Sequence, residues 1–132
     1  MKLRIKGNSM RLRLSQSEVT KLAQRGEIED TIHFAPQPEA KLTYALNVAP
    51  PGKALSLQYQ SQKITIYLES ESVAHWATME NEVGIYGDVE NGYGRLAVLI
   101  EKDFACLDAS GEDNEDTFPN PNECRTSSKE IG

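Results

Sequence analysis

The chain has 132 residues, of which 39% are hydrophobic and 26% charged, and its formal net charge is −6. This length suits one domain that buries its own core, and the negative charge argues against non-specific nucleic-acid binding. No apolar run approaches the roughly 18 residues of a membrane span, and the charged start at residues 1–6 does not resemble a signal peptide, so we expect a cytoplasmic protein.

Apolar and polar side chains alternate in eight short segments, which is typical of strands with one buried face. Ser15 and Glu18 have the spacing of a capping box ahead of side chains at helical spacing, and Gly26 is suited to end that helix. A second helix is expected at residues 70–79. The expected strands are residues 2–6, 10–14, 28–34, 42–48, 55–59, 63–68, 83–89 and 95–104.

The two halves of the chain resemble one another at an offset of 54 residues. Sliding the chain by this offset places Leu3 on Leu57 and Leu12 on Ile66, and the order β-β-α-β-β repeats. The third strands align less well, and a shift of one residue is expected there. The sequence therefore predicts an internal repeat.

The predicted fold class is α+β, with two pseudo-symmetric β-β-α-β-β units that form an eight-stranded, mainly antiparallel sheet or barrel with two helices. Closure into a barrel is favoured because it would remove exposed strand edges. The expected domain is residues 1–107, made of repeats 1–53 and 54–107. Residues 108–132 are expected to form an acidic, poorly structured tail, because they are rich in acids and poor in apolar side chains.

The strings MKLRIKGNSMRLRLSQSEV, LTYAL and EKDFACLD, followed by FPNP, resemble a family of small bacterial proteins of unknown function. The resemblance covers residues 1 to about 121. It implies a bacterial cytoplasmic protein and supplies no activity, cofactor or catalytic residue.

Five cations are expected on one surface of the first hairpin, because side chains alternate along each of its strands. The corresponding positions of the second unit are neutral, so the fold does not require this charge. The surface could bind a phosphate or another anion, but it could also be a solvated face or a docking site for the acidic tail. The predicted anion-binding residues are Lys2, Arg4, Lys6, Arg11 and Arg13.

The sequence favours a non-catalytic module that binds a small anion or a protein partner. It contains no Gly-rich phosphate loop, Ser-His-Asp order or zinc helix motif. A phosphate-ester hydrolase is an alternative, but its metal chemistry needs carboxylates beside the cations, and the first hairpin has none. His33 is expected to point away from the core between core-facing Ile32 and Phe34, and His75 to border the apolar stripe of its helix.

The tail is a second candidate site, for a divalent metal. Carboxylates suit Ca²⁺ or Mg²⁺ and thiolates suit Zn²⁺, but the mixture has no standard spacing, so a solubilising tail is the other interpretation. A free thiol on the core side of the last strand, with poor reactivity, is expected at the first cysteine. The candidate ligands are Cys106, Asp108, Glu112, Asp113 and Asp116.

Overall fold

The computed structural model describes residues 1–104 and Phe118. This part of the chain contains eight strands and two helices in the expected order, which confirms the α+β class. The elements are β1 (Lys2–Lys6), β2 (Ser9–Leu14), α1 (Gln16–Arg25), β3 (Glu27–His33), β4 (Lys41–Ala49), β5 (Ser56–Gln60), β6 (Lys63–Glu69), α2 (Ser70–Thr78), β7 (Gly84–Glu90) and β8 (Arg95–Lys102).

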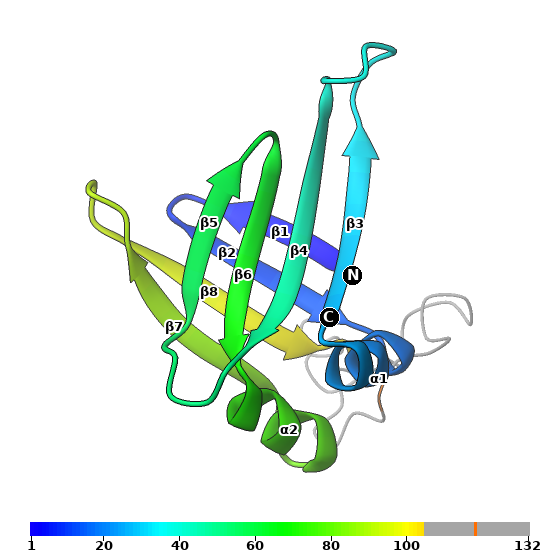
Figure 1. Ribbon diagram of the computed structural model, residues 1–132, viewed down its shortest axis with the longest axis vertical. Coiled ribbons are helices and arrows are strands. Elements are labelled where there is room, and N and C mark those ends of the chain that lie inside the picture. The colour runs from blue at the N-terminus through cyan, green and yellow to red at the C-terminus, as the bar shows by residue number, and fades with distance from the viewer. Residues whose placement is uncertain (105–117, 119–132) are drawn as a thin grey trace, which may run out of the picture.

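The strands form two four-stranded sheets (Figure 1). Sheet A has the order β1-β2-β8-β7 and sheet B has the order β3-β4-β6-β5. Each sheet contains two antiparallel hairpins that meet at a parallel central pair, β2–β8 in sheet A and β4–β6 in sheet B. The predictions of a closed barrel and of a single eight-stranded sheet are therefore wrong. The alternation of apolar and polar side chains along a strand indicates that one face is buried, but it does not determine which other strands pair with it.

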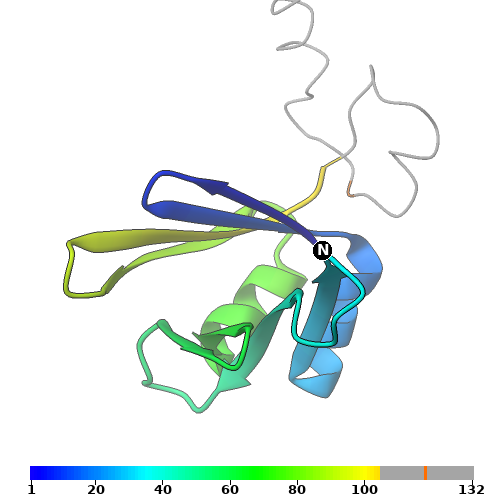
Figure 2. The same ribbon diagram turned by 90° about the horizontal axis from the view of Figure 1, so that it is seen from above.

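The two sheets face one another across a shared core, and the helices lie together at one end (Figures 1 and 2). Both sheets and both helices supply fully buried side chains, so neither sequence half has a core of its own. The largest of these side chains are Trp76, Leu12, Leu14, Leu22, Leu46, Ile66, Leu68, Ile100, Val73 and Val98. No helix in the described part of the chain is both long and apolar enough to cross a membrane.

Both ends of α1 follow the predicted capping signals. The Ser15 amide donates to Glu18 Oε1 at 2.9 Å, and the Glu18 amide donates to Ser15 Oγ at 3.4 Å. Gly26 ends the helix with a φ of +84°, in the left-handed region that favours glycine. Its carbonyl accepts from the Val48 amide at 2.8 Å, so the chain turns sharply and β3 leaves the helix end beside β4.

The far end of the β3–β4 hairpin differs from expectation. Ile32 and Phe34 were predicted to face the core, but they are 46% and 65% exposed. This hairpin extends past the rest of the molecule (Figure 1), so no opposing layer covers these side chains. His33 is exposed, as predicted.

Lys102 is a buried cation on the core face of β8, with 4% of its surface exposed. Its Nζ donates to the Met79 carbonyl at 2.9 Å and lies 5.3 Å from the centre of the Phe118 ring. Burial lowers the pKa of Lys102, although the negative charges of Glu82 and Glu80 oppose this. The Phe118 amide donates to the Asp103 carbonyl at 2.9 Å, so Phe118 packs against the end of β8.

Candidate functional site

The β1–β2 register places the five predicted cations on one face of sheet A. Lys2 lies opposite Arg13, Arg4 opposite Arg11, and Lys6 opposite Ser9. Residues that lie directly opposite share a face of the sheet, and the intervening Leu12 is fully buried on the other side. We call this outer surface, formed by Lys2, Arg4, Lys6, Arg11 and Arg13, the basic face.

Strand β8 brings a carboxylate into the basic face. The parallel β2–β8 pairing sets Glu101 beside Arg13. Its Oε1 lies 3.3 Å from Arg11 Nε and 3.7 Å from Arg13 Nε, and its Oε2 accepts from the Tyr86 hydroxyl at 3.1 Å. Burial and the charge of Glu101 both raise the pKa of Tyr86, which keeps its hydroxyl protonated as the donor.

Positive charge is therefore unevenly balanced along the basic face. At one end Lys2 Nζ lies 2.9 Å from Asp103 Oδ2. At the other end, Arg4 and Lys6 form no ion pair within residues 1–104 and Phe118. Arg4 and Lys6 therefore carry charge that no acid in the described residues balances, and Arg11, which shares Glu101 with Arg13, lies opposite Arg4.

Arg11 is only partly satisfied by its acidic neighbour. Its Nε is close enough to Glu101 for an ionic contact but lacks hydrogen-bond geometry, and within the described residues it is buried without a hydrogen-bond partner. Arg4 lies directly opposite, and like charges in that position destabilise a sheet. An anion held by the outer ends of these two side chains would relieve the repulsion between them.

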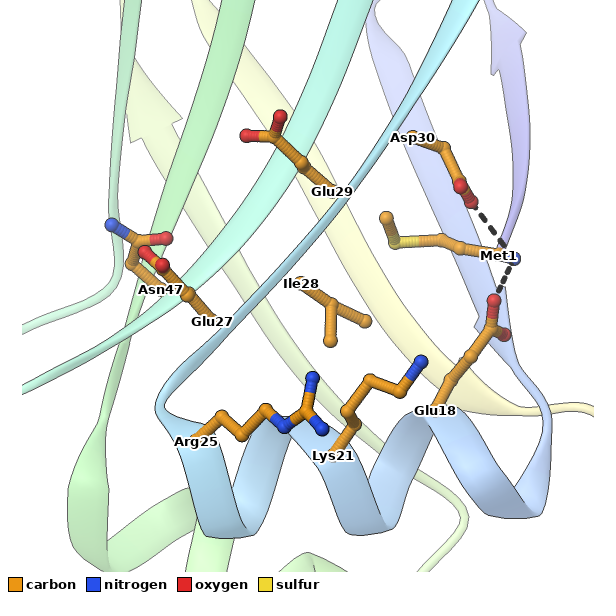
Figure 3. Close-up of a pocket in the computed structure, with 9 residues that line it drawn as sticks. All are labelled: Met1, Glu18, Lys21, Arg25, Glu27, Ile28, Glu29, Asp30 and Asn47. Atoms are coloured by element: carbon orange, nitrogen blue, oxygen red, sulfur yellow. Dashed lines mark hydrogen bonds and ion pairs between the residues drawn. The ribbon is translucent and has the colours of Figure 1, made fainter.

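A cleft of about 260 Å³ lies between α1 and β3 (Figure 3). The Met1 ammonium donates to Glu18 Oε2 there and lies 3.2 Å from Asp30 Oδ2. Burial alone would lower the pKa of this ammonium, but its contacts with Glu18 and Asp30 outweigh burial and raise it. Burial alone would raise the pKa of Glu18, but the ammonium and Ser15 outweigh burial and lower it.

The Met1–Glu18 ion pair makes stability depend on pH at both ends of the range. Because the pKa of Glu18 is lowered in the folded chain, its contribution is present above about pH 4.3 and is lost as pH falls through the lowered value. Because the pKa of the ammonium is raised, its contribution is present below about pH 8 and is lost as pH rises through the raised value. We expect Glu18→Gln to lower the free energy of unfolding by about 0.5–1 kcal/mol between these limits.

Urea unfolding of wild type and Glu18→Gln at about pH 3, 6.5 and 10 measures this difference. Glutamine keeps the capping box, so the difference should shrink at both extremes. Ser15→Ala is the control, because it removes the cap and should lower stability by about 1 kcal/mol at both pH 6.5 and pH 10. Its effect should be smaller at pH 3, since Ser15 also helps to lower the pKa of Glu18. An unchanging difference for Glu18→Gln across pH would show that the ion pair contributes nothing.

Two features of these surfaces were missed by the sequence analysis. Glu101 and Asp103 reach the basic face only through the pairing of β8 with β2. Glu101 does carry a local signal, because it falls between buried Ile100 and Lys102 and must point outward. The α1–β3 cleft was also missed, although Lys21 and Arg25 share a helix face at a spacing of four.

The remaining candidates do not assemble into a site in the described residues. The predicted metal ligands Cys106, Asp108, Glu112, Asp113 and Asp116 lie outside them, as does the proposed docking of the acidic tail. Among residues 1–104 and Phe118, no group of three or more His, Cys, Asp or Glu side chains could hold a metal. His75 is exposed and its Nε2 lies 3.4 Å from Glu82 Oε2.

Comparison with known proteins gives a family and no activity. No curated protein matches the chain, and no solved structure matches it. One family of unknown function, DUF7009, matches residues 1–122. Since this match covers well over half of the chain and reaches past Phe118, the chain belongs to the family of unknown function DUF7009.

Proposed function

We propose that this protein is a non-catalytic binding module whose basic face takes a small multivalent anion, such as a phosphate group, between Arg4, Lys6 and Arg11. The observation that carries the proposal is the charge that stays unbalanced at this end of the face. Guanidinium groups bind phosphate oxygens through two parallel hydrogen bonds, and an ammonium adds a point charge. The three side chains therefore offer more donors than the single acid nearby can satisfy.

We also propose that the two β-β-α-β-β units are pseudo-symmetric, a relation that supports the interpretation that the fold does not require the charge of the basic face. Shifting the chain by 54 residues carries the pair Lys2–Arg13 onto Ser56–Tyr67, and both are opposite partners in their hairpins. The same shift carries Arg4 onto Gln58. A neutral side chain thus occupies the equivalent place in sheet B.

The central parallel pairs support the same relation. The pair Ser9–Ala97 in sheet A becomes Lys63–Thr43 in sheet B under the same offset. The third strands fit with a shift of three residues, because Asn47 pairs with Glu27 whereas Glu101 pairs with Gly84. The expected shift of one residue was too small.

A calorimetric titration with sodium pyrophosphate at low salt tests the anion site. We expect Arg4→Gln to weaken binding by at least about ten-fold, since it removes a charge-assisted donor pair. The same variant should be more stable than wild type by about 0.2–1 kcal/mol, because the like-charge pair with Arg11 is gone. Weaker pyrophosphate binding together with a higher free energy of unfolding would identify Arg4 as a binding residue, because loss of a structural residue lowers stability.

Lys53→Gln is the matched control, because it removes one exposed cation from the loop between β4 and β5. It should leave pyrophosphate affinity within about two-fold, since screened charges far from the site act weakly. The proposal fails if wild type does not bind pyrophosphate, or if Arg4→Gln and Lys53→Gln weaken binding equally.

A further inference from the structure

We infer that the phosphate ligand of the basic face also carries an aromatic base, and that a nucleoside diphosphate lies across the outer face of sheet A with its base on Tyr86. This assignment rests on the proposed function, because it takes the phosphate site at Arg4, Lys6 and Arg11 as its starting point. Strands β8 and β7 complete the site and define the class of ligand.

One row of side chains crosses all four strands of sheet A on its outer face. Arg4 on β1 lies opposite Arg11 on β2. Leu99 on β8 lies beside Arg11 and opposite Tyr86 on β7. The strands lie side by side in the order β1-β2-β8-β7 (Figure 1). Because residues in register on neighbouring strands share a face, the row runs from two cations through an apolar side chain to an aromatic ring.

The Tyr86 ring lies over the sheet and is accessible from solvent. Its hydroxyl donates to Glu101 Oε2 at 3.1 Å, and a Cβ added to Gly84 would lie 2.8 Å from its Cζ atom. The ring therefore covers the glycine with one face, yet 54% of the residue is exposed. An exposed aromatic ring held flat against a sheet is a surface on which a nucleobase stacks.

A row at the matching register of sheet B has neither the cations nor the aromatic ring. It contains Gln58, Thr65, Ala45 and Glu29, on β5, β6, β4 and β3 respectively. Glu29 Oε1 lies 3.1 Å from Lys63 Nζ, so the charge of this row is already paired. Sheet A therefore combines two arginines with an exposed ring at positions where sheet B is polar and uncharged or acidic.

The spacing of the row suits a ligand with a base at one end and two phosphates at the other. Tyr86 and Arg11 are two strand spacings apart, about 10 Å, and Arg4 stands one spacing, about 5 Å, beyond Arg11. With the base on Tyr86, the sugar crosses Leu99 and the two phosphates reach the guanidinium groups. Each guanidinium can bind phosphate oxygens through two hydrogen bonds, and Lys6 adds a third positive charge beside them.

Glu101 does not exclude a phosphate from this row. Its carboxylate contacts Arg11, Arg13 and the Tyr86 hydroxyl, and 15% of its side chain is exposed. Its negative charge is therefore largely offset by two guanidinium groups. Arg4 is on β1, two strands away from Glu101 on β8, so the outer phosphate lies on the side of the row that is remote from the acid.

Acids at the β7 edge set the direction of the ligand. Asp88 and Glu90 follow Tyr86 at alternate positions of β7, so they share its outer face. Asp88 Oδ2 lies 3.8 Å from Arg95 Nη1. Phosphates are attracted to the cations of β1 and β2 and repelled from β7, so the base is the end of the ligand that faces β7. A nucleic-acid strand would carry further phosphates toward these acids, which favours a single nucleotide.

Calorimetric titration at low salt with ADP, pyrophosphate and adenosine tests whether the base contributes. We expect ADP to bind at least about five-fold more tightly than pyrophosphate, because it adds stacking of one base on an aromatic side chain. Adenosine lacks phosphate and should bind at least about ten-fold more weakly than ADP. If ADP binds no more tightly than pyrophosphate, the assignment of a nucleotide is overturned and the proposed phosphate site stands. If pyrophosphate does not bind, the proposed function fails and the assignment fails with it.

Two variants of Tyr86 separate the ring from its hydroxyl. Tyr86→Phe and Tyr86→Leu both release Glu101, so both change the phosphate site in the same way, but only Tyr86→Phe keeps an aromatic ring. The ratio of ADP affinity to pyrophosphate affinity should therefore stay at the wild-type value in Tyr86→Phe and fall by at least about five-fold in Tyr86→Leu.

Tyr59→Leu is the matched control, because it removes an exposed tyrosine ring from β5 in the other sheet. It should leave the ratio unchanged, whereas Arg4→Gln should weaken ADP and pyrophosphate together by at least about ten-fold. Equal ratios in Tyr86→Phe and Tyr86→Leu, or an equal fall in Tyr59→Leu, would show that the base does not lie on Tyr86.

Discussion

Replacing Trp76 by alanine is expected to lower the free energy of unfolding by about 3–5 kcal/mol, the range for a large aromatic removed from a packed core. Trp76 is 1% exposed and lies on α2, where it faces both sheets. Its Nε1 also donates to the Val83 carbonyl at 3.0 Å, and that carbonyl accepts from the Lys102 amide at 3.0 Å. The indole therefore fills the core and fixes the chain just before β7.

Urea unfolding followed by far-ultraviolet circular dichroism measures the effect, because Trp76 is the single tryptophan and its fluorescence is lost in the variant. Trp76→Phe keeps most of the buried area but not the hydrogen bond, so a smaller loss of about 1–2 kcal/mol is expected. His75→Ala, at an exposed neighbouring position, should change stability by at most about 0.5 kcal/mol. A loss for Trp76→Ala no larger than that of His75→Ala would mean that the helix does not anchor the core.

Local signals predicted the elements of this fold because each depends on residues that are close in sequence. The capping box at Ser15 and Glu18 set the start of α1, and Gly26 set its end. In the structure, residues 7 and 8 form a two-residue turn that sets the register of the first hairpin, and this register places all five cations on one face. These interactions form without information from the rest of the chain.

The arrangement of the sheets could not be predicted in the same way. Strand β2 pairs with β8, so Ser9 lies beside Ala97, and no short-range pattern reports a contact across most of the domain. A strand with one buried face fits an open sheet, a barrel or two facing sheets equally well. The expectation of barrel closure rested on the removal of edges alone, and in this fold β1, β3, β5 and β7 remain edges.

The role of Glu101 in the basic face was missed for the same reason, because it depends on strand pairing between distant parts of the chain. The first hairpin has no acid in its own sequence, which weighed against metal chemistry there. Its acid comes instead from Glu101, and Tyr86 on β7 orients that acid by a hydrogen bond. The charge balance of the face is therefore set by four strands together, and only the strand order reveals it.

Gly84→Ala is the second substitution for which a large effect is expected, because a side chain there has no room. A Cβ on Gly84 would lie 2.7 Å from the Ile100 carbonyl oxygen and 2.7 Å from the Tyr86 hydroxyl. The Ile100 oxygen belongs to the backbone of β8 and cannot rotate away. The Tyr86 ring covers Gly84, as aromatic side chains often cover glycines in sheets. An added methyl group would therefore force the ring to move away. Overpacking of this kind lowers the free energy of unfolding by about 1–3 kcal/mol.

Displacement of Tyr86 should also change anion binding at the basic face. This second effect distinguishes the clash at Gly84 from a substitution that only lowers stability. Without the Tyr86 hydroxyl, Glu101 is free to move toward Arg11 and Arg13, and pyrophosphate binding should change along with urea stability. Gly87→Ala is the matched control on the same strand, since the nearest atoms to its Cβ would be those of the Leu55 side chain, at 3.4 Å or more, an ordinary contact. That variant should be near neutral, because alanine reduces the freedom of the unfolded chain. If Gly84→Ala is as stable as Gly87→Ala, then Tyr86 does not lie across Gly84 in solution.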